Sequence, residues 1–286
     1  MLNRLAPAKV NLVLEVLAKR DDGYHEIRSL VQTINLCDVI SFERASGISL
    51  ECTESNLQTS NNLVVRAAEL LKEVSGGEKG VKIGLKKRIP WGVGLGGGSS
   101  DAAATLLTLN KLWGLELTTS DLVELAAKLG SDVPFFVYQG TALIEGRGEK
   151  VTPLLASAPS WFVLLLPPLP EVPHKTRQLY ALLGSQHFTE GQFVSEALEA
   201  WSQKKRIAPP LLYNVFDDIA FDAFPGLEGY WKRFEKAGAA DIHLAGSGPA
   251  IFAPVDGEAK AQEVHRWLFQ QGLEAYSVST VIPQAV

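Results

Sequence analysis

The segment from Pro90 to Ala104 constrains this chain more than any other part of the sequence. It reads Pro-Trp-Gly-Val-Gly-Leu-Gly-Gly-Gly-Ser-Ser-Asp-Ala-Ala-Ala and is followed by a leucine-rich stretch. Glycine adopts positive φ and allows another atom to approach the backbone closely. The Ala/Leu run predicts a helix with Ser99 or Ser100 as its N-cap and Asp101 in its first turn. A glycine loop that opens a helix presents free N–H groups at a positive dipole end, so it favours an anion, and phosphate is the natural one.

The loop differs from two common phosphate-binding patterns. A Walker loop needs Gly-Lys-Ser/Thr, which does not occur in this sequence. Residues Gly92–Gly97 match G-x-G-x-x-G, but a dinucleotide-binding loop follows its strand directly. Here Lys86–Pro90 separates the loop from the expected strand Val81–Leu85. A flexible surface linker is the remaining alternative, and the capped amphipathic helix that follows the loop disfavours it.

The composition excludes several other classes of protein. The chain has 286 residues, 46% hydrophobic and 21% charged, so one large or two ordinary domains with a sizeable core are expected. The net charge of −5 argues against nucleic acid as the main partner. Cys37 and Cys52 are the only cysteines, too few for a disulfide framework or a cysteine-rich zinc site. The start lacks a signal-peptide pattern, and the apolar run Trp161–Leu166 is too short to span a bilayer, so a cytoplasmic protein without a membrane partner is expected.

Periodicity and turn residues predict an order of elements in both halves of the chain. The first half is expected to contain strands at 9–17, 30–34, 38–42 and 81–85, and helices at 63–74, from the glycine loop to Gly114, and from a Thr118–Asp121 capping box to Gly130. The second half is expected to contain helices near 176–183, 190–203, 229–237 and 257–271, and strands near 160–166, 240–244, 250–254 and 275–281. Strands and helices separated in this way predict an α+β sandwich with helices on one face of an antiparallel sheet.

The stretch Pro153–Pro159 has two prolines and no periodicity, and it reads as a domain boundary. We therefore predict an N-terminal domain at residues 1–155 and a C-terminal α+β domain at residues 156–286. Further along, Gly246–Pro249 falls between two expected strands, and a plain hairpin turn is its simplest interpretation.

Several polar residues carry a structural and a functional interpretation side by side. Lys9 heads an apolar strand, where it is either solvated or aimed into a cleft, and Asn11 shares its face of the strand. Asp132 lies between a helix that ends at Gly130 and a new turn, so it is an N-cap, a carboxylate that accepts a hydroxyl proton, or both. Tyr24 and His25 follow a charged turn, where they are either exposed or able to stack on and hydrogen-bond a nucleobase.

Taken together, these segments resemble the GHMP small-molecule kinases. The resemblance rests on Pro7–Asn11, on the loop from Pro90 with its Asp-Ala-Ala-Ala extension, on Gly130–Pro134 and on Gly246–Phe252, in the expected order along nearly the whole chain. Asp22-Gly-Tyr-His25 resembles the branch that phosphorylates the methylerythritol part of a CDP-linked substrate. The resemblance implies an α+β GHMP kinase fold, with an N-terminal domain like ribosomal protein S5 domain 2, a ferredoxin-like C-terminal domain and the site between them.

The resemblance also implies roles for individual residues. It implies ATP and Mg²⁺ as cofactors, CDP-methylerythritol as the small-molecule partner, and a monomer or weak homodimer that binds neither nucleic acid nor membrane. The metal ligands stay open, with Ser100 as a candidate. The implied catalytic pair is Lys9 and Asp132, and the implied substrate contacts are Asn11, Tyr24, His25 and Thr176. The implied ATP contacts are Asn62, Pro90, Gly92, Gly94, Gly96, Gly97, Gly98, Ser99 and Ser100.

A few positions depart from the family pattern. Trp91 and Val93 replace the residues expected in the loop, Val215 replaces a carboxylate, and His174-Lys175 replaces small polar residues before Thr176. These departures leave the implied catalytic pair untouched and bear on the second-domain substrate contacts. Two alternatives remain: another GHMP kinase acting on a mevalonate-type or homoserine-type alcohol, and a nucleotide-binding protein of this fold without turnover.

Overall fold

The structure is a computed structural model that describes residues 1–155, 158–204 and 207–281. The chain divides into two compact units, each built from several segments. The first unit comprises Met1–Ala8, Leu36–Trp91 and Gly96–Gln139, and the second comprises Lys9–Asn35, Gly92–Leu95 and Gly140–Val286. The predicted boundary at residue 155 adjoins the undescribed residues 156–157 and stays a prediction. The long strands β1 (Leu2–Lys19) and β2 (His25–Arg44) contribute to both units.

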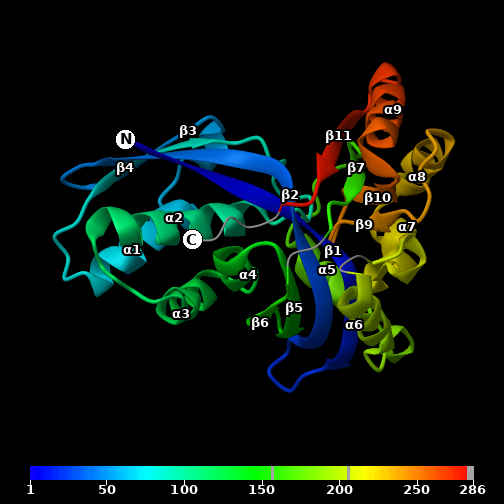
Figure 1. The fold of residues 1–286 in the computed structure, drawn as a ribbon, viewed down its shortest axis with the longest axis horizontal. Helices are drawn as coiled ribbons and strands as arrows, with labels where there is room; N and C mark the ends of the chain where they lie inside the picture. The colour runs from blue at the N-terminus through cyan, green and yellow to red at the C-terminus, as the bar shows by residue number, and fades with distance from the viewer. Residues whose placement is uncertain (156–157, 205–206, 282–286) are drawn as a thin grey trace. The chain divides into compact units, whose positions relative to one another are not determined.

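The first unit combines a sheet with four helices. The strands β3 (Ile48–Cys52) and β4 (Val81–Lys86) are parallel, and β4 pairs antiparallel with the C-terminal part of β2. The helices α1, α2, α3 and α4 pack on one another, with α2 in contact with the other three (Figure 1). Their bounds are α1 (Leu63–Val74), α2 (Gly97–Trp113), α3 (Thr119–Leu129) and α4 (Val133–Tyr138).

The second unit contains the four-stranded sheet predicted for the C-terminal half. Its strand order is β11-β7-β10-β9, and all its pairs are antiparallel. The helix α9 packs against β7, β10 and β11, as Figure 1 shows at the red end of the chain. The strands are β7 (Trp161–Leu166), β9 (His243–Leu244), β10 (Ile251–Val255) and β11 (Glu274–Ser279), and the helices are α5 (Lys175–Leu182), α6 (Gln192–Lys204), α7 (Ala220–Ala223), α8 (Leu227–Lys236) and α9 (Gly257–Gln270). This arrangement confirms the expected α+β class.

The second unit also holds pairings that the sequence analysis did not predict. The strand β5 (Thr141–Gly146) pairs with the first part of β2, and β6 (Lys150–Pro153) pairs with β5. The two-residue strand β8 (Tyr213–Asn214) pairs parallel with β1 at Val13 and Leu14. These strands are short or polar, so their alternation is too weak to predict from the sequence.

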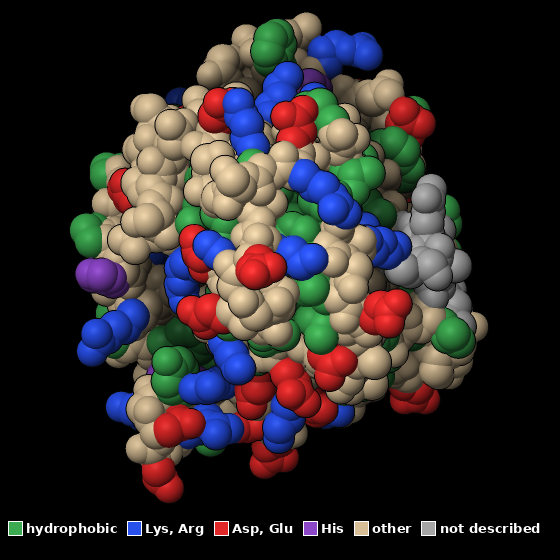
Figure 2. Space-filling view, turned by 90° about the vertical axis from the view of Figure 1, so that its left-hand side faces the viewer, with side chains coloured by type: hydrophobic (Ala, Val, Ile, Leu, Met, Phe, Trp, Pro, Cys, Tyr) green, Lys and Arg blue, Asp and Glu red, His purple; other side chains and the backbone are tan. Residues whose placement is uncertain are grey.

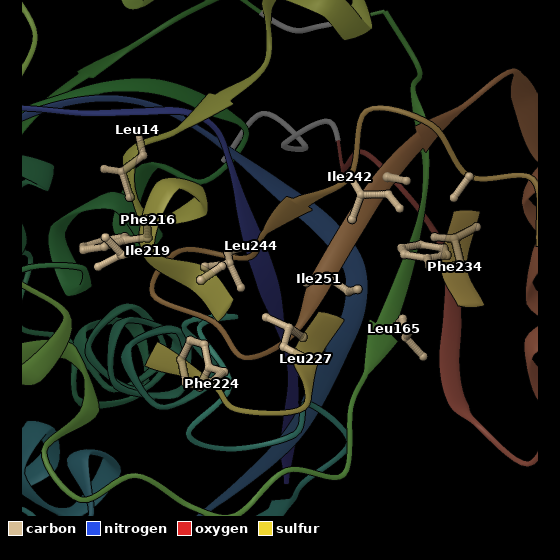
Figure 3. Close-up of a cluster of buried hydrophobic side chains, with 14 of the residues drawn as sticks. Leu14, Leu165, Phe216, Ile219, Phe224, Leu227, Phe234, Ile242, Leu244 and Ile251 are labelled. Carbon is tan, nitrogen blue, oxygen red and sulfur yellow. The ribbon is translucent and has the colours of Figure 1, made fainter. Parts of the chain in front are cut away.

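A large cluster of buried apolar side chains forms the core of the second unit. Figure 3 shows Leu14, Leu165, Leu244 and Ile251 from the sheets together with Phe216, Phe224, Leu227 and Phe234 from the helical segments. Burying one such side chain stabilises a fold by about 1.5–3 kcal/mol. Val215 is fully buried in this cluster. A carboxylate at this position would carry a desolvation cost, so the departure at Val215 is compatible with the apolar core.

Two predicted strands proved to be parts of longer ones. The expected strands 30–34 and 38–42 are segments of the single strand β2, and β1 extends beyond 9–17 in both directions. In β1 every residue from Ala6 to Val16 is buried. A strand buried on both faces reads as a continuous apolar run rather than an alternating one. The buried run of β1 therefore places three polar residues, Lys9, Asn11 and Glu15, inside the protein.

Candidate functional site

Lys9 is buried within β1 rather than solvated at a strand end. Its side chain is 7% exposed, and its Nζ donates a hydrogen bond to Asn11 Oδ1 at 2.6 Å. Asn11 Nδ2 donates to Ser29 Oγ at 2.9 Å, and Ser29 Oγ donates to the carbonyl of Val13 at 2.6 Å. Lys9 and Asn11 lie on the same face of β1, as predicted, because side chains two residues apart in a strand point to the same side. The chain of hydrogen bonds fixes which amide atom of Asn11 faces the ammonium group.

The first part of the glycine loop packs against the β9–β10 hairpin of the same unit. Gly94 has φ of +96°, and a Cβ atom there would lie 1.8 Å from the carbonyl oxygen of Ala245. The amide of Lys9 donates to the carbonyl of Leu95 at 3.0 Å. On the other side, a Cβ atom on Gly246 would lie 2.8 Å from Lys9 Nζ. The segment Gly246–Pro249 is therefore a hairpin turn, as predicted. Gly246 also lies directly beside Lys9.

Asn214 holds this hairpin in place. Its Nδ2 donates to the carbonyls of Leu244 and Gly246, both at 2.8 Å, and its Oδ1 accepts from the amide of Phe216. Asn214 is 1% exposed, so all three hydrogen bonds form in the protein interior. Asn214 thus positions Gly246 next to Lys9, while its neighbour Val215 packs in the core.

The second part of the glycine loop opens α2 in the first unit. The helix begins at Gly97, and its N-cap is Gly96, with φ of +72°. The expectation that Ser99 or Ser100 caps this helix is wrong, because both residues lie within its first turns. The first N–H groups of a helix have no intrahelical partner, so the start of α2 offers free donors, and anion binding there stays a prediction. Ser100 Oγ is buried and has no hydrogen-bond partner in the described part of the chain.

Asp101 belongs to a buried charge cluster and lies beyond the first turn of α2, so the expectation that it lies in the first turn is wrong. It is the fifth residue of the helix, and its Oδ2 accepts from Lys87 Nζ at 2.8 Å. Lys87 also forms a short ion pair with Asp38, whose other oxygen accepts from the amide of Ile89 at 2.9 Å. Burial is the main reason why the pKa of Asp101 lies above its ordinary value. The cluster ties the start of α2 to β2 and to the segment before the loop, and nothing in the sequence spacing indicated it.

Asp132 occupies the N-cap position of α4 in the first unit. It follows Gly130, which ends α3, as the sequence predicted. Its side chain makes no capping hydrogen bond, and the residue is exposed. The carboxylate is therefore not committed to the helix terminus.

Asn62 is the N-cap of α1. Its Oδ1 accepts from the amide of Val64 at 3.0 Å, and its Nδ2 donates to the carbonyl of Leu57 at 2.8 Å. Both functional groups of the amide are thus used in holding the start of the helix. A contact between Asn62 and adenine stays a prediction.

Tyr24 and His25 differ in their surroundings. Tyr24 is 53% exposed, and the guanidinium of Arg147 lies 5.0 Å from the centre of its ring. His25 stacks on Tyr180, with ring centres 4.9 Å apart and planes inclined by 22°, and it meets the ring of Phe188 edge-on. Burial and then the charge of Lys19 lower the pKa of His25. The tertiary structure thus adds Arg147, Tyr180 and Phe188 to a pair that the sequence had singled out.

Thr176 reaches the same hairpin that borders Lys9. Its Oγ1 lies 3.1 Å from Ser247 Oγ, and the preceding Lys175 donates from Nζ to the carbonyl of Gly248. Both residues lie at the start of α5. In the sequence, Thr176 matches a substrate contact of the family, whereas Lys175 stands out only as a departure from the family pattern.

In residues 1–155, 158–204 and 207–281, no three His, Cys, Asp or Glu side chains gather in a way that could hold a metal ion. Over the same ranges, no helix has the length and apolar character needed to cross a membrane. Acidic and basic side chains are interspersed over the face drawn in Figure 2.

Comparison with known proteins places these features in a family. Residues 62–140 match the GHMP kinases N terminal domain, and residues 196–272 match the GHMP kinases C terminal domain. The chain is 46% identical over 283 residues to 4-diphosphocytidyl-2-C-methyl-D-erythritol kinase of Dehalococcoides mccartyi, covering 99% of each chain. It is 37% identical over 266 residues to the enzyme of the same name from a Geobacillus species, covering 92% of this chain and 91% of that one.

A solved structure agrees with the sequence comparison. The crystal structure of a 4-(cytidine 5'-diphospho)-2C-methyl-D-erythritol kinase superimposes with a TM-score of 0.85 at 36% identity. The match covers 99% of this chain and 100% of the other. The likeness therefore extends over both predicted domains.

Proposed function

This chain belongs to the 4-diphosphocytidyl-2-C-methyl-D-erythritol kinase family of GHMP kinases, and we propose that it phosphorylates the 2-hydroxyl of that cytidyl substrate. It is a small-molecule kinase that uses ATP. The reaction serves the synthesis of isoprenoid precursors without mevalonate. The observation that carries the proposal is the buried Lys9, which lies beside Gly246, together with the exposed Tyr24 and the stacked His25.

The glycine loop is proposed to bind the phosphates of ATP. Gly96 has positive φ and opens α2, so the first amides of the helix face outward as donors. The loop residues named from the family pattern, Pro90 to Ser100, would surround the phosphates, with Asn62 near the adenine. Phosphoryl transfer depends on positioning and on neutralising charge more than on covalent chemistry. A pre-shaped loop supplies both.

Lys9 and Asp132 are proposed to act as the catalytic pair. The ammonium of Lys9 is held by Asn11 Oδ1 and would help to neutralise the phosphoryl group in transfer. Asp132 would accept or orient the proton of the attacking hydroxyl. Its carboxylate is available because it makes no capping bond. Asn11 would contact the polyol, and Thr176 would lie on the substrate side.

Mg²⁺ is proposed to accompany ATP. The buried hydroxyl of Ser100 lacks a partner within the described ranges, so it fits a ligand for the ion or a donor to a phosphate oxygen. Magnesium typically takes few protein ligands and completes its shell with phosphate oxygens and water. When bound, the ion would neutralise charge on the phosphates. We further propose that the protein is cytoplasmic, is a monomer or weak homodimer, and has no nucleic-acid partner.

An ADP-release assay tests the substrate assignment. The acceptors would be CDP-methylerythritol, methylerythritol phosphate, mevalonate and homoserine at equal concentrations. Only the first is expected to support turnover above background. Turnover with mevalonate or homoserine instead would move the chain to another branch of the GHMP kinases, and ATP binding without any turnover would support the non-catalytic alternative.

Replacing Tyr24 by Ala is expected to raise the KM for the cytidyl substrate much more than the KM for ATP. Loss of one base–aromatic stack costs about 1–3 kcal/mol, which corresponds to roughly a 5- to 150-fold rise in KM. Tyr24→Phe is the matched control and should have a mild effect, since it keeps the ring on which Arg147 lies. A KM within about twofold of wild type in Tyr24→Ala, a change of ~0.4 kcal/mol, would show that the ring is only an exposed turn residue.

The KM for the cytidyl substrate is expected to rise as the pH falls below about 6.5. The pKa of His25 is lower than its ordinary value, so the imidazole is neutral at neutral pH and gains its charge only in more acidic solution. Protonation removes its acceptor nitrogen, which could serve the cytosine edge. Steady-state kinetics from acidic to neutral pH would measure this, and His25→Ala should flatten the profile and weaken discrimination between cytosine and uracil. A His25→Ala profile that matches wild type would remove His25 from base recognition.

A further inference from the structure

Lys175 occupies a position that disfavours a positive charge. It is the first residue of α5, where the helix dipole repels a cation. Burial, and then the positive charge of Lys9, lower its pKa to about 7. In the described ranges, no carboxylate forms an ion pair with it. A lysine in such a place costs stability unless something offsets the charge.

The hairpin between β9 and β10 connects Lys175 to Lys9. Lys175 Nζ donates to the carbonyl of Gly248 and Thr176 Oγ1 lies 3.1 Å from Ser247 Oγ. Two residues before Gly248, Gly246 lies so close to Lys9 that a Cβ atom would be 2.8 Å from its Nζ. Both lysines therefore border one short loop within the second unit.

We propose that Lys175 binds a phosphate oxyanion next to Lys9, as a second cationic residue of the phosphoryl-transfer site. An ammonium group has three donors, and the carbonyl of Gly248 takes one, which leaves two for phosphate oxygens. An anion would also offset the repulsion from Lys9 and from the helix dipole. The inference rests on the proposed function, because that function brings two phosphate-containing ligands to this protein.

Two ligands share the required chemistry. One source of the oxyanion is ATP or its product ADP, and the other is the diphosphate of the cytidyl substrate. The probes that separate them are ADP and CDP, each titrated into the full chain. Binding is measured directly, so the result does not depend on whether the acceptor is phosphorylated.

A bound anion is expected to raise the pKa of Lys175, so binding should take up a proton. Near pH 7.5, a group with a pKa of about 7 can gain at most about 0.8 proton. Isothermal titration calorimetry in two buffers of different ionisation enthalpy measures this uptake. Lys9 on β1 is the charged side chain that acts on Lys175, while the hairpin contributes a carbonyl and a hydroxyl.

Three variants make the experiment specific. Lys175→Met removes the charge at similar length, and it is expected to weaken ADP or CDP binding by about 10- to 100-fold and to abolish proton uptake. Lys175→Arg keeps a permanent charge, so it should restore much of the affinity without any proton uptake. Lys236→Met, at the exposed end of α8, is the matched control and should behave as wild type.

The outcomes separate this inference from its alternatives. A loss confined to ADP assigns Lys175 to the nucleotide that donates the phosphoryl group, and a loss confined to CDP assigns it to the diphosphate of the substrate. Wild-type affinity of Lys175→Met for both probes overturns the proposal. Proton uptake that persists in Lys175→Arg also contradicts it. Failure of the acceptor assay with intact Lys175-dependent binding would overturn the proposed function alone.

Discussion

Replacing Asp132 by Asn is expected to lower kcat by about 10²–10⁴-fold and to leave ATP affinity nearly unchanged. The amide cannot accept the hydroxyl proton, yet it keeps the size and position of the carboxylate. Asp132 makes no capping hydrogen bond, so the substitution should cost little stability. Steady-state kinetics with the cytidyl substrate, combined with direct measurement of ATP binding, would check both parts. A variant with wild-type kcat would remove Asp132 from the mechanism.

Asp121 provides the matched control for this experiment. It lies in the same unit and closes the capping box of α3, where it accepts from the amide of Thr118 at 2.8 Å. Asp121→Asn should lower stability by up to about 1 kcal/mol through the weakened cap, with kcat unchanged. If both variants lose kcat equally, the effect of Asp132→Asn is a general consequence of losing an acidic residue here and not a role in proton transfer.

Replacing Gly96 by Val is expected to raise the KM for ATP at least about tenfold or to prevent productive binding. Gly96 has φ of +72°, a conformation that costs a β-branched residue about 1–3 kcal/mol. Relief of this strain would move the amides that open α2 away from the phosphates. The same change at Gly97 should act through crowding, since a Cβ atom there would lie 3.0 Å from the Ile89 side chain. Unchanged ATP affinity in a folded variant would show that this loop is not the phosphate site.

The other end of the same helix offers the control. Gly114 ends α2 with φ of +64°, and nothing lies within 4 Å of the position its Cβ would take. Gly114→Val therefore introduces similar backbone strain at the end of α2 that carries no expected ligand. Thermal unfolding should report a comparable loss of stability in Gly96→Val and Gly114→Val, and only the first should change the KM for ATP.

Elements that local interactions control could be predicted from the sequence. The capping box at Thr118 and the helix ends at Gly114 and Gly130 appear as predicted. Such signals lie within a few residues of the bonds they form, so one segment is enough to read them. The glycine loop that opens a helix was predictable for the same reason. The resemblance to the GHMP kinases then named the candidate residues.

Contacts between residues distant in the chain became known only from the fold. The stacking of His25 on Tyr180, the position of Gly94 against Ala245, and the cluster that joins Lys87 to two carboxylates could not be read from spacing. The helix α2 begins at Gly97, earlier than the two serines suggested, and its buried Asp101 accepts a hydrogen bond from Lys87.

Lys175 shows most clearly the difference between what the sequence predicts and what the fold adds. In the sequence it was an unexplained departure before Thr176, with no periodicity or motif to mark it. In the fold its Nζ donates to the carbonyl of Gly248, and burial together with the charge of Lys9 lowers its pKa. Lys9 lies more than a hundred and fifty residues earlier in the chain. Local hydrogen bonds and side-chain periodicity depend on short segments of the sequence. Burial and the electrostatic field at a side chain depend instead on every segment that packs around it.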